Sequence, residues 1–171
     1  MQKLSRPRTL FLDRDGVINY EKEADYIHNW DEFQFYPGAA EAIAGLCNLF
    51  DLTIIVTNQK GVGKGVTRVE DLDLIHQNMT KAIELAGGKI NAIYYCPDTD
   101  SNSPDRKPNP GMAFKAKADF ARVNFTNSLM VGNNLSDLNF GRNAGMKTAF
   151  LRTTQPDIFL PEGLADLEAA D

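Results

Sequence analysis

Short apolar runs alternate along this chain with longer segments in which apolar residues recur every three or four positions. The short runs, rich in β-branched residues, indicate strands buried on both faces at residues 9–12, 52–56, 90–96, 129–131 and 148–151. The longer segments indicate helices at residues 38–50, 67–86, 109–123 and 135–143, and we expect one more short helix after Pro156. Strands that alternate with helices predict an α/β fold, a doubly wound parallel sheet covered by helices on both faces.

Local signals mark two helix starts and two loops. Thr67 and Glu70 have the spacing of a capping box, and Pro110 suits the first turn of the helix that follows it. The polar loop 20–35 is too long for a tight connection, so we expect it to form a flap. The glycine-rich segment 60–65 does not match the Walker phosphate-binding motif. We therefore expect either a basic loop that contacts the substrate or a mobile turn.

Length, charge and cysteine content narrow the class of protein. The chain has 171 residues, which suits one domain over residues 1–171, and a net charge of −5, which argues against nucleic acid or an anionic membrane as partner. No apolar run reaches the length of a signal peptide or a transmembrane helix. Cys47 and Cys96 lie far apart, which favours reduced thiols and a cytoplasmic location. His28 and His76 have no catalytic partner in the sequence, and we expect both on the surface.

Two aspartates follow the first expected strand directly. Asp13 and Asp15 are two residues apart, so at a strand end they share a face, and Gly16 then allows a sharp turn. A divalent cation offsets the repulsion between two clustered carboxylates, and oxygen-only ligands favour Mg²⁺. The alternative is that one aspartate caps a loop while the other is solvated. An EF-hand is excluded, because glycine follows the second aspartate directly.

The other polar clusters also follow expected strands. They are residues 57–59 after the second strand, residues 97–108 after the third and residues 132–137 after the fourth. Parallel sheets bind ligands beyond the carboxyl ends of their strands. All of the candidate chemistry is therefore expected at one edge of the sheet.

These residues resemble the four motifs of the haloacid dehalogenase (HAD) superfamily of phosphohydrolases. In chain order the motifs are Asp13-x-Asp15-Gly-Val, Thr57 at a strand end, Lys107 before a helix, and Gly132-Asn133-x-x-x-Asp137. More narrowly, the chain resembles the D-glycero-D-manno-heptose 1,7-bisphosphate phosphatase family and the related histidinol-phosphate phosphatases. This resemblance spans residues 10–153 and rests on Phe-Leu-Asp-Arg-Asp-Gly-Val-Ile-Asn, Val-Thr-Asn-Gln, Ile-Tyr-Tyr-Cys-Pro and Arg-Lys-Pro-x-Pro-Gly-Met.

The resemblance implies a HAD-like, capless phosphatase that works through an aspartyl-phosphate. Asp13 would be the nucleophile, and Asp15 would protonate the leaving oxygen and then activate water. Thr57 would hold phosphoryl oxygens and Lys107 would neutralise charge. Mg²⁺ would be the cofactor, held by Asp13, Asp15, Asn133 and Asp137.

The resemblance also implies a small phosphorylated sugar as substrate. The first choice is the 7-phosphate of the heptose 1,7-bisphosphate, and the second is histidinol phosphate. Because neither connection that houses a cap in relatives is long enough for a domain, we expect an open site and a monomer. Substrate contacts would come from Asn58, Gln59, Lys60, Arg106 and Asn134, with Lys64 as a further cation.

The chain departs from the family pattern in the loop where many relatives carry a zinc site. Those relatives have Cys-x-His followed by Cys-x-Cys. Here Cys96 remains, but Asp98, Ser103 and Asp105 occupy the other positions. One thiolate with scattered carboxylates does not make a structural zinc site, so we predict no zinc.

A second departure is Asn133, which stands where the family has a metal-binding aspartate. An amide oxygen can ligate Mg²⁺ but brings no charge. This leaves a rival hypothesis, a phosphosugar-binding pseudoenzyme with a weakened metal site. A phosphotransferase with an acceptor other than water is a lesser alternative.

Overall fold

The computed structural model describes residues 9–170, which form one sheet with helices on both faces. All strand pairs in the sheet are parallel, and the strand order is β3-β2-β1-β4-β5-β6. The strands are β1 (Thr9–Leu12), β2 (Leu52–Asn58), β3 (Ala92–Cys96), β4 (Ser128–Gly132), β5 (Lys147–Leu151) and β6 (Leu167–Ala169). This architecture confirms the predicted fold class.

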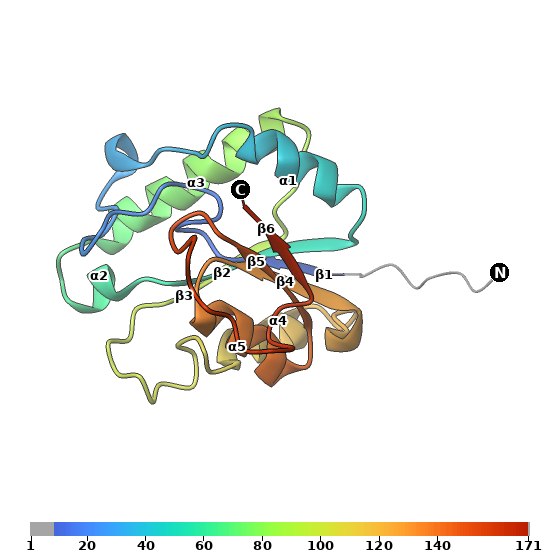
Figure 1. Cartoon of the computed structure of the whole chain (residues 1–171). Helices are drawn as coiled ribbons and strands as arrows, with labels where there is room; N and C mark the ends of the chain where they lie inside the picture. Colours follow the sequence, from blue (N-terminus) through green and yellow to red (C-terminus); the bar gives the residue numbers. More distant parts are fainter. Residues whose placement is uncertain (1–8, 171) are drawn as a thin grey trace.

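The helices form two layers around the sheet. Helices α1 (Ala39–Cys47) and α3 (Val69–Leu85) lie on one face, and α4 (Gly111–Asp119) and α5 (Leu135–Ala144) lie on the other (Figure 1). Each layer packs its own apolar cluster against the strands. The shorter elements are η1 (Trp30–Glu32), α2 (Lys60–Gly63) and η2 (Phe125–Asn127).

Strand β1 occupies the centre of the sheet, and its carboxyl end therefore lies between those of β2 and β4. Phe11 is in register with Ile54 on one side and Met130 on the other. All four residues of β1 are buried, because helices cover both of its faces. The residues that follow β1 are thereby brought together with those that follow β2 and β4.

The chain after Pro156 does not form the predicted helix. It forms β6, which pairs with the edge strand β5, and the Arg152 amide donates to the Ala169 carbonyl. Pro161 interrupts helical hydrogen bonding in this segment, and Gly163 adopts a positive φ of 74°. The unpaired edge of β5 supplies the hydrogen bonds that a helix would otherwise have made.

The predicted capping box at Thr67 is also wrong. Helix α3 begins at Val69 with Arg68 as its N-cap and no side-chain cap. The Thr67 hydroxyl lies 3.0 Å from Nδ1 of His28 instead. A tertiary hydrogen bond has replaced the local one.

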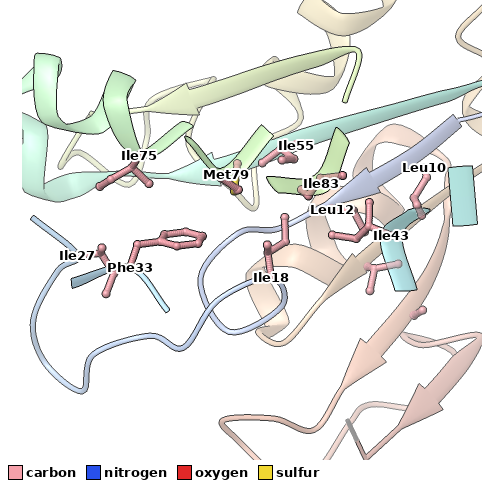
Figure 2. Packing of buried hydrophobic residues seen from close by; sticks show 12 residues of the cluster. Leu10, Leu12, Ile18, Ile27, Phe33, Ile43, Ile55, Ile75, Met79 and Ile83 are labelled. Carbon is pink, nitrogen blue, oxygen red and sulfur yellow. The ribbon is translucent and has the colours of Figure 1, made fainter. Parts of the chain in front are cut away.

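Loop 20–35 packs into the core as well as covering the carboxyl edge of the sheet. Ile27 and Phe33 point into the cluster formed with Ile75 and Met79 of α3 (Figure 2). The loop is therefore anchored by apolar contacts at two points. The glycine-rich segment is likewise ordered, because Lys60–Gly63 forms the helical turn α2.

Two other features of the described residues bear on the sequence predictions. His76, expected on the surface, is buried on the inner side of α3. In residues 9–170, no helix is both long enough and apolar enough to cross a bilayer.

Candidate active site

A cleft of about 170 Å³ opens beyond the carboxyl ends of β1 and β2. Its walls combine residues from four separate segments of the chain. Of the predicted site residues, eight line it: Asp13, Asp15, Thr57, Asn58, Gln59, Lys107, Asn134 and Asp137. The fold thus brings most of the predicted site together.

Lys107 joins two carboxylates at the base of the cleft. Its Nζ donates to Asp13 Oδ1 at 2.7 Å, lies 2.7 Å from Asp137 Oδ1, and donates to the Val56 carbonyl at 2.9 Å. All three charged side chains are buried. Asn58 holds Lys107 in place, because its side chain pairs with the Lys107 backbone N–H and C=O, both at 3.1 Å.

The charge balance at this point shifts the pKa of Asp13 upward. Burial and the nearby Asp137 carboxylate raise the pKa of Asp13 to about 7, although Lys107 opposes the rise. Burial works against the charge on Lys107, but the two aspartates raise its pKa overall. One buried cation therefore does not fully compensate two buried carboxylates, and a further positive charge would favour ionised Asp13.

Asp15 is surrounded by hydrogen-bond donors. Asn19 donates to its Oδ1 at 2.9 Å, Gln59 donates to its Oδ2 at 2.9 Å, and Arg14 donates to both oxygens. Burial raises the pKa of Asp15, but the Arg14 charge and these hydrogen bonds outweigh it and lower the pKa overall. The surroundings of Asp15 therefore favour the ionised form of its carboxyl group.

Close backbone approaches fix the segment that follows β4. Asp137 Oδ2 accepts hydrogen bonds from the Asn133 and Asn134 amides at 3.1 and 3.0 Å. A Cβ on Gly132 would lie 2.1 Å from the Asp137 side chain. Gly16, at a φ of 85°, leaves no room for one either, because its Cβ would lie 2.0 Å from Nδ2 of Asn133.

The oxygens around Asn133 suit a divalent cation. Asn133 is fully buried, its Nδ2 donates to Thr154 Oγ1 at 2.8 Å, and its Oδ1 has no hydrogen-bond partner. An unpartnered buried carbonyl oxygen is costly unless something binds it. An amide oxygen of this kind fits Mg²⁺, which prefers oxygen ligands. The proposed Mg²⁺ ligands therefore include a neutral amide oxygen. Among residues 9–170, no group of three His, Cys, Asp or Glu side chains could hold a metal.

Asp137 contributes to this region through charge and hydrogen bonds. One of its oxygens faces Lys107 and the other accepts two backbone amides. In this arrangement both oxygens of the predicted metal ligand are already engaged.

Two predicted substrate residues lie outside the cleft lining. Lys60 is in the first turn of α2, and Arg106 donates from Nη1 to the Asp98 carbonyl at 3.1 Å. Asn134 does line the cleft, and its Oδ1 accepts from Gln155.

The sequence did not indicate five loop residues of the cleft and one buried arginine. The five residues belong to loop 20–35 and line the cleft: Glu21, Lys22, Asp25, Tyr26 and Ile27. Burial at the cleft raises the pKa of Glu21, although Thr154 and Asn133 interact with its carboxylate and oppose the rise. The length of this loop indicated a cover, but loop residues carry no periodicity that shows which side chains face inward. Arg14 gave no signal beyond its place between two aspartates.

The loop that carries zinc in many relatives is held here by hydrogen bonds. Ser103 Oγ donates to Asp98, and the Asn109 side chain donates to the Ser103 carbonyl at 2.8 Å. Cys96 Sγ lies 4.0 Å from Ser103 Oγ, and Cys96 is a free cysteine. The absence of zinc stays a prediction.

Comparisons with known proteins agree with this geometry. A family model described as HAD-hydrolase-like matches residues 105–158. The chain is 34% identical over 158 residues to the D-glycero-alpha-D-manno-heptose-1,7-bisphosphate 7-phosphatase of Mycobacterium tuberculosis, covering 92% of this chain and 83% of that protein. It is 36% identical over 165 residues to the D-glycero-beta-D-manno-heptose-1,7-bisphosphate 7-phosphatase of Vibrio cholerae, covering 91% and 87%.

A solved structure extends the likeness to three dimensions. The D,D-heptose 1.7-bisphosphate phosphatase from B. bronchiseptica, complexed with magnesium and phosphate, matches with a TM-score of 0.85 at 32% identity. The match covers 96% of this chain and 93% of that one.

Proposed function

Because this chain belongs to the HAD-superfamily family of D-glycero-D-manno-heptose 1,7-bisphosphate 7-phosphatases, we propose that it removes the 7-phosphate of that sugar with Asp13 as nucleophile. The chain is a phosphatase, and the family resemblance of its sequence is confirmed. The observation that carries the residue assignment is the contact between Asp13 and Lys107, in a cleft that Thr57 and Asp15 also line.

The first step forms a bond between an Asp13 oxygen and phosphorus. Lys107 donates to Oδ1 of Asp13, so Oδ2 is the oxygen available for in-line attack. Asp15 first takes up a proton from solvent, because its surroundings favour the ionised form. The leaving sugar oxygen then departs with the electrons of the P–O bond and takes that proton from the Asp15 carboxyl. The Thr57 hydroxyl and the Lys107 ammonium stabilise the charge on the phosphoryl oxygens.

The second step returns the enzyme to its starting state. Asp15, now ionised, accepts a proton from the water that attacks the aspartyl-phosphate. The acyl phosphate bond breaks, phosphate leaves, the Asp13 carboxylate is regenerated and Asp15 releases the accepted proton to solvent. The donors around Asp15 favour its ionised form, which is the form needed here.

The residues that would hold Mg²⁺ are Asp13, the Asp15 carbonyl and Asn133 through Oδ1, with Asp137 nearby as a further negative charge. When bound, the ion supplies positive charge to the nucleophile and to the phosphoryl oxygens.

Phosphate release from purified substrates tests the assignment. Both anomers of the heptose 1,7-bisphosphate and histidinol phosphate are incubated with the protein and Mg²⁺, and ³¹P NMR identifies which phosphate is lost. We expect loss of the 7-phosphate and much slower release from histidinol phosphate. Equal and poor rates on all substrates would overturn the heptose assignment.

The rival pseudoenzyme hypothesis rests on Asn133 and makes a different prediction. A binding module would retain affinity for the bisphosphate and release no phosphate at any Mg²⁺ concentration. Calorimetric titration of the bisphosphate, run beside the release assay, distinguishes the two.

A further inference from the structure

Arg14 is an arginine with no solvent exposure, placed between the two aspartates of the first motif. A buried guanidinium carries a desolvation cost of several kcal/mol unless it is fully paired. Arg14 is paired on both sides. Its fork faces the Asp15 carboxylate, and its remaining nitrogen faces α3.

The fork fixes the plane of the Asp15 carboxylate. Arg14 Nε and Nη2 donate to Asp15 Oδ1 at 3.1 and 2.8 Å, and Nη2 also lies 3.0 Å from Oδ2. A planar guanidinium imposes direction on a carboxylate in a way that an ammonium cannot. About a quarter of the Asp15 side chain remains exposed toward the cleft.

The two oxygens of Asp15 differ in their surroundings. Oδ1 accepts from Arg14 Nε, Arg14 Nη2 and Asn19 Nδ2, and Asn19 is fully buried. Oδ2 accepts from Arg14 Nη2 and from Gln59 Nε2, and Gln59 lines the cleft. Oδ1 is therefore saturated on the protein side, while Oδ2 is the oxygen beside the cleft.

His76 holds Arg14 from behind. Its Nε2 lies 3.3 Å from Arg14 Nη1, and both side chains are buried. Since arginine has no acceptor, this contact requires Nε2 of His76 to accept. A residue 62 positions away on a helix of the core thus determines where the guanidinium sits.

We propose that Arg14 and His76 are positioning residues for proton transfer, which together orient the Asp15 carboxyl so that Oδ2 exchanges the proton with the leaving oxygen. The inference rests on the proposed function, since it assigns the orientation of the acid in that reaction. Neither residue touches the phosphoryl group in this account. Both act through Asp15.

The test compares two esters that differ in how much the leaving oxygen needs a proton. p-Nitrophenyl phosphate releases a stabilised phenolate, whereas phenyl phosphate, of nearly the same shape, gains more from a general acid. Arg14→Lys removes the fork, and His76→Leu removes the acceptor for Arg14. We expect kcat for phenyl phosphate to fall at least about tenfold more than kcat for p-nitrophenyl phosphate in both variants.

The conservative variant His76→Gln provides the matched control. Its side-chain oxygen can still accept from Arg14, so it should recover most of the wild-type ratio between the two esters. Thermal unfolding of each variant, measured beside the wild type, checks that the fold is retained. An equal loss on both esters, or the same ratio in His76→Leu and His76→Gln, would overturn the inference.

Failure of the proposed function would give a different experimental result from failure of this inference. If the wild type hydrolyses both aryl esters but not the heptose bisphosphate, the sugar assignment is wrong while the role of Arg14 is still measured. If the wild type releases no phosphate from any ester, the phosphatase assignment and the inference are both overturned.

Discussion

At the scale of single residues, Asp13 is the position that separates catalysis from binding. Asp13→Asn removes the proposed nucleophile but leaves a side chain of the same size. We expect kcat to fall at least about a thousandfold, because an amide does not attack phosphorus. Phosphate release from the heptose bisphosphate measures the effect, and calorimetry should show that ligand binding persists. If Asp13→Asn released phosphate at the wild-type rate, the assignment of Asp13 as nucleophile would be contradicted.

Asn133→Asp tests the proposal that Asn133 is a ligand of Mg²⁺. A unit charge at contact distance is worth about 4 kcal/mol at an effective dielectric of about 20, before the ion's lost hydration is subtracted. If a third of this survives, the Mg²⁺ concentration for half-maximal activity should fall about tenfold. Mg²⁺ titrations of phosphate release and calorimetric Mg²⁺ binding measure the change.

Asn127→Asp is the matched control for that variant. Asn127 ends η2, directly before β4, at the edge of the sheet opposite the cleft. The Asn127→Asp substitution adds the same charge far from the site and should leave the Mg²⁺ titration of phosphate release unchanged. Superimposable curves for Asn133→Asp and wild type would show that Asn133 does not face the metal.

The sequence predicted residues that line the cleft at strand ends more reliably than buried residues that contact them from the core. Asp13, Thr57 and Lys107 were predictable because each follows or precedes a recognisable element. The partnership of Arg14 with His76 was not, since no local pattern links positions 62 residues apart. Such a contact depends on how α3 lies across the sheet.

At the scale of elements, loop 20–35 behaves as part of the core. Phe33 stacks on Trp30 with ring centroids 5.0 Å apart, and it is buried in the cluster shared with α3. We expect Phe33→Ala to lower the free energy of unfolding by about 3 kcal/mol, since it leaves a cavity. Chemical denaturation measures the loss. Phe159→Ala is the control, because Phe159 is 85% exposed and its removal should change little.

Prediction of elements failed where tertiary contacts competed with local preference. Strands β1 and β2 were predictable, since their unbroken apolar runs match burial on both faces. The tail was not, because the free edge of β5 decides the structure of residues 167–169, and an edge has no signature in the tail's own sequence.

At the scale of the whole molecule, the parallel sheet connects the candidate active site to the core of the fold. Asp13 and Lys107 are 94 residues apart in sequence and meet at the end of β1. Arg14, next to Asp13, reaches His76 in the opposite direction, toward α3. Two adjacent residues therefore contact the base of the cleft on one side and the buried face of α3 on the other.

This arrangement predicts how stability depends on pH. Burial first, and then the Arg14 charge, lower the pKa of His76 to about 3, although Asp15 opposes the shift. The unfolded chain takes up the proton near pH 6.5, but the folded protein does not. The contribution of His76 is therefore fully present above about pH 6.5 and is lost as pH falls toward 3, at about 1.4 kcal/mol per pH unit.

The comparison of wild type with His76→Gln isolates this contribution. Glutamine can accept from Arg14 and does not titrate, so the free energy of unfolding of the variant should lack the loss below pH 6.5. The raised pKa of Asp13 acts in the opposite direction, since the folded protein keeps that proton as pH rises from 3.8 toward 7. Both proteins contain Asp13, so its effect cancels in the difference between them. Denaturation curves for the two proteins between pH 4 and 7 should therefore diverge steadily as pH falls, whereas a constant difference would mean that His76 titrates alike in the folded and unfolded states.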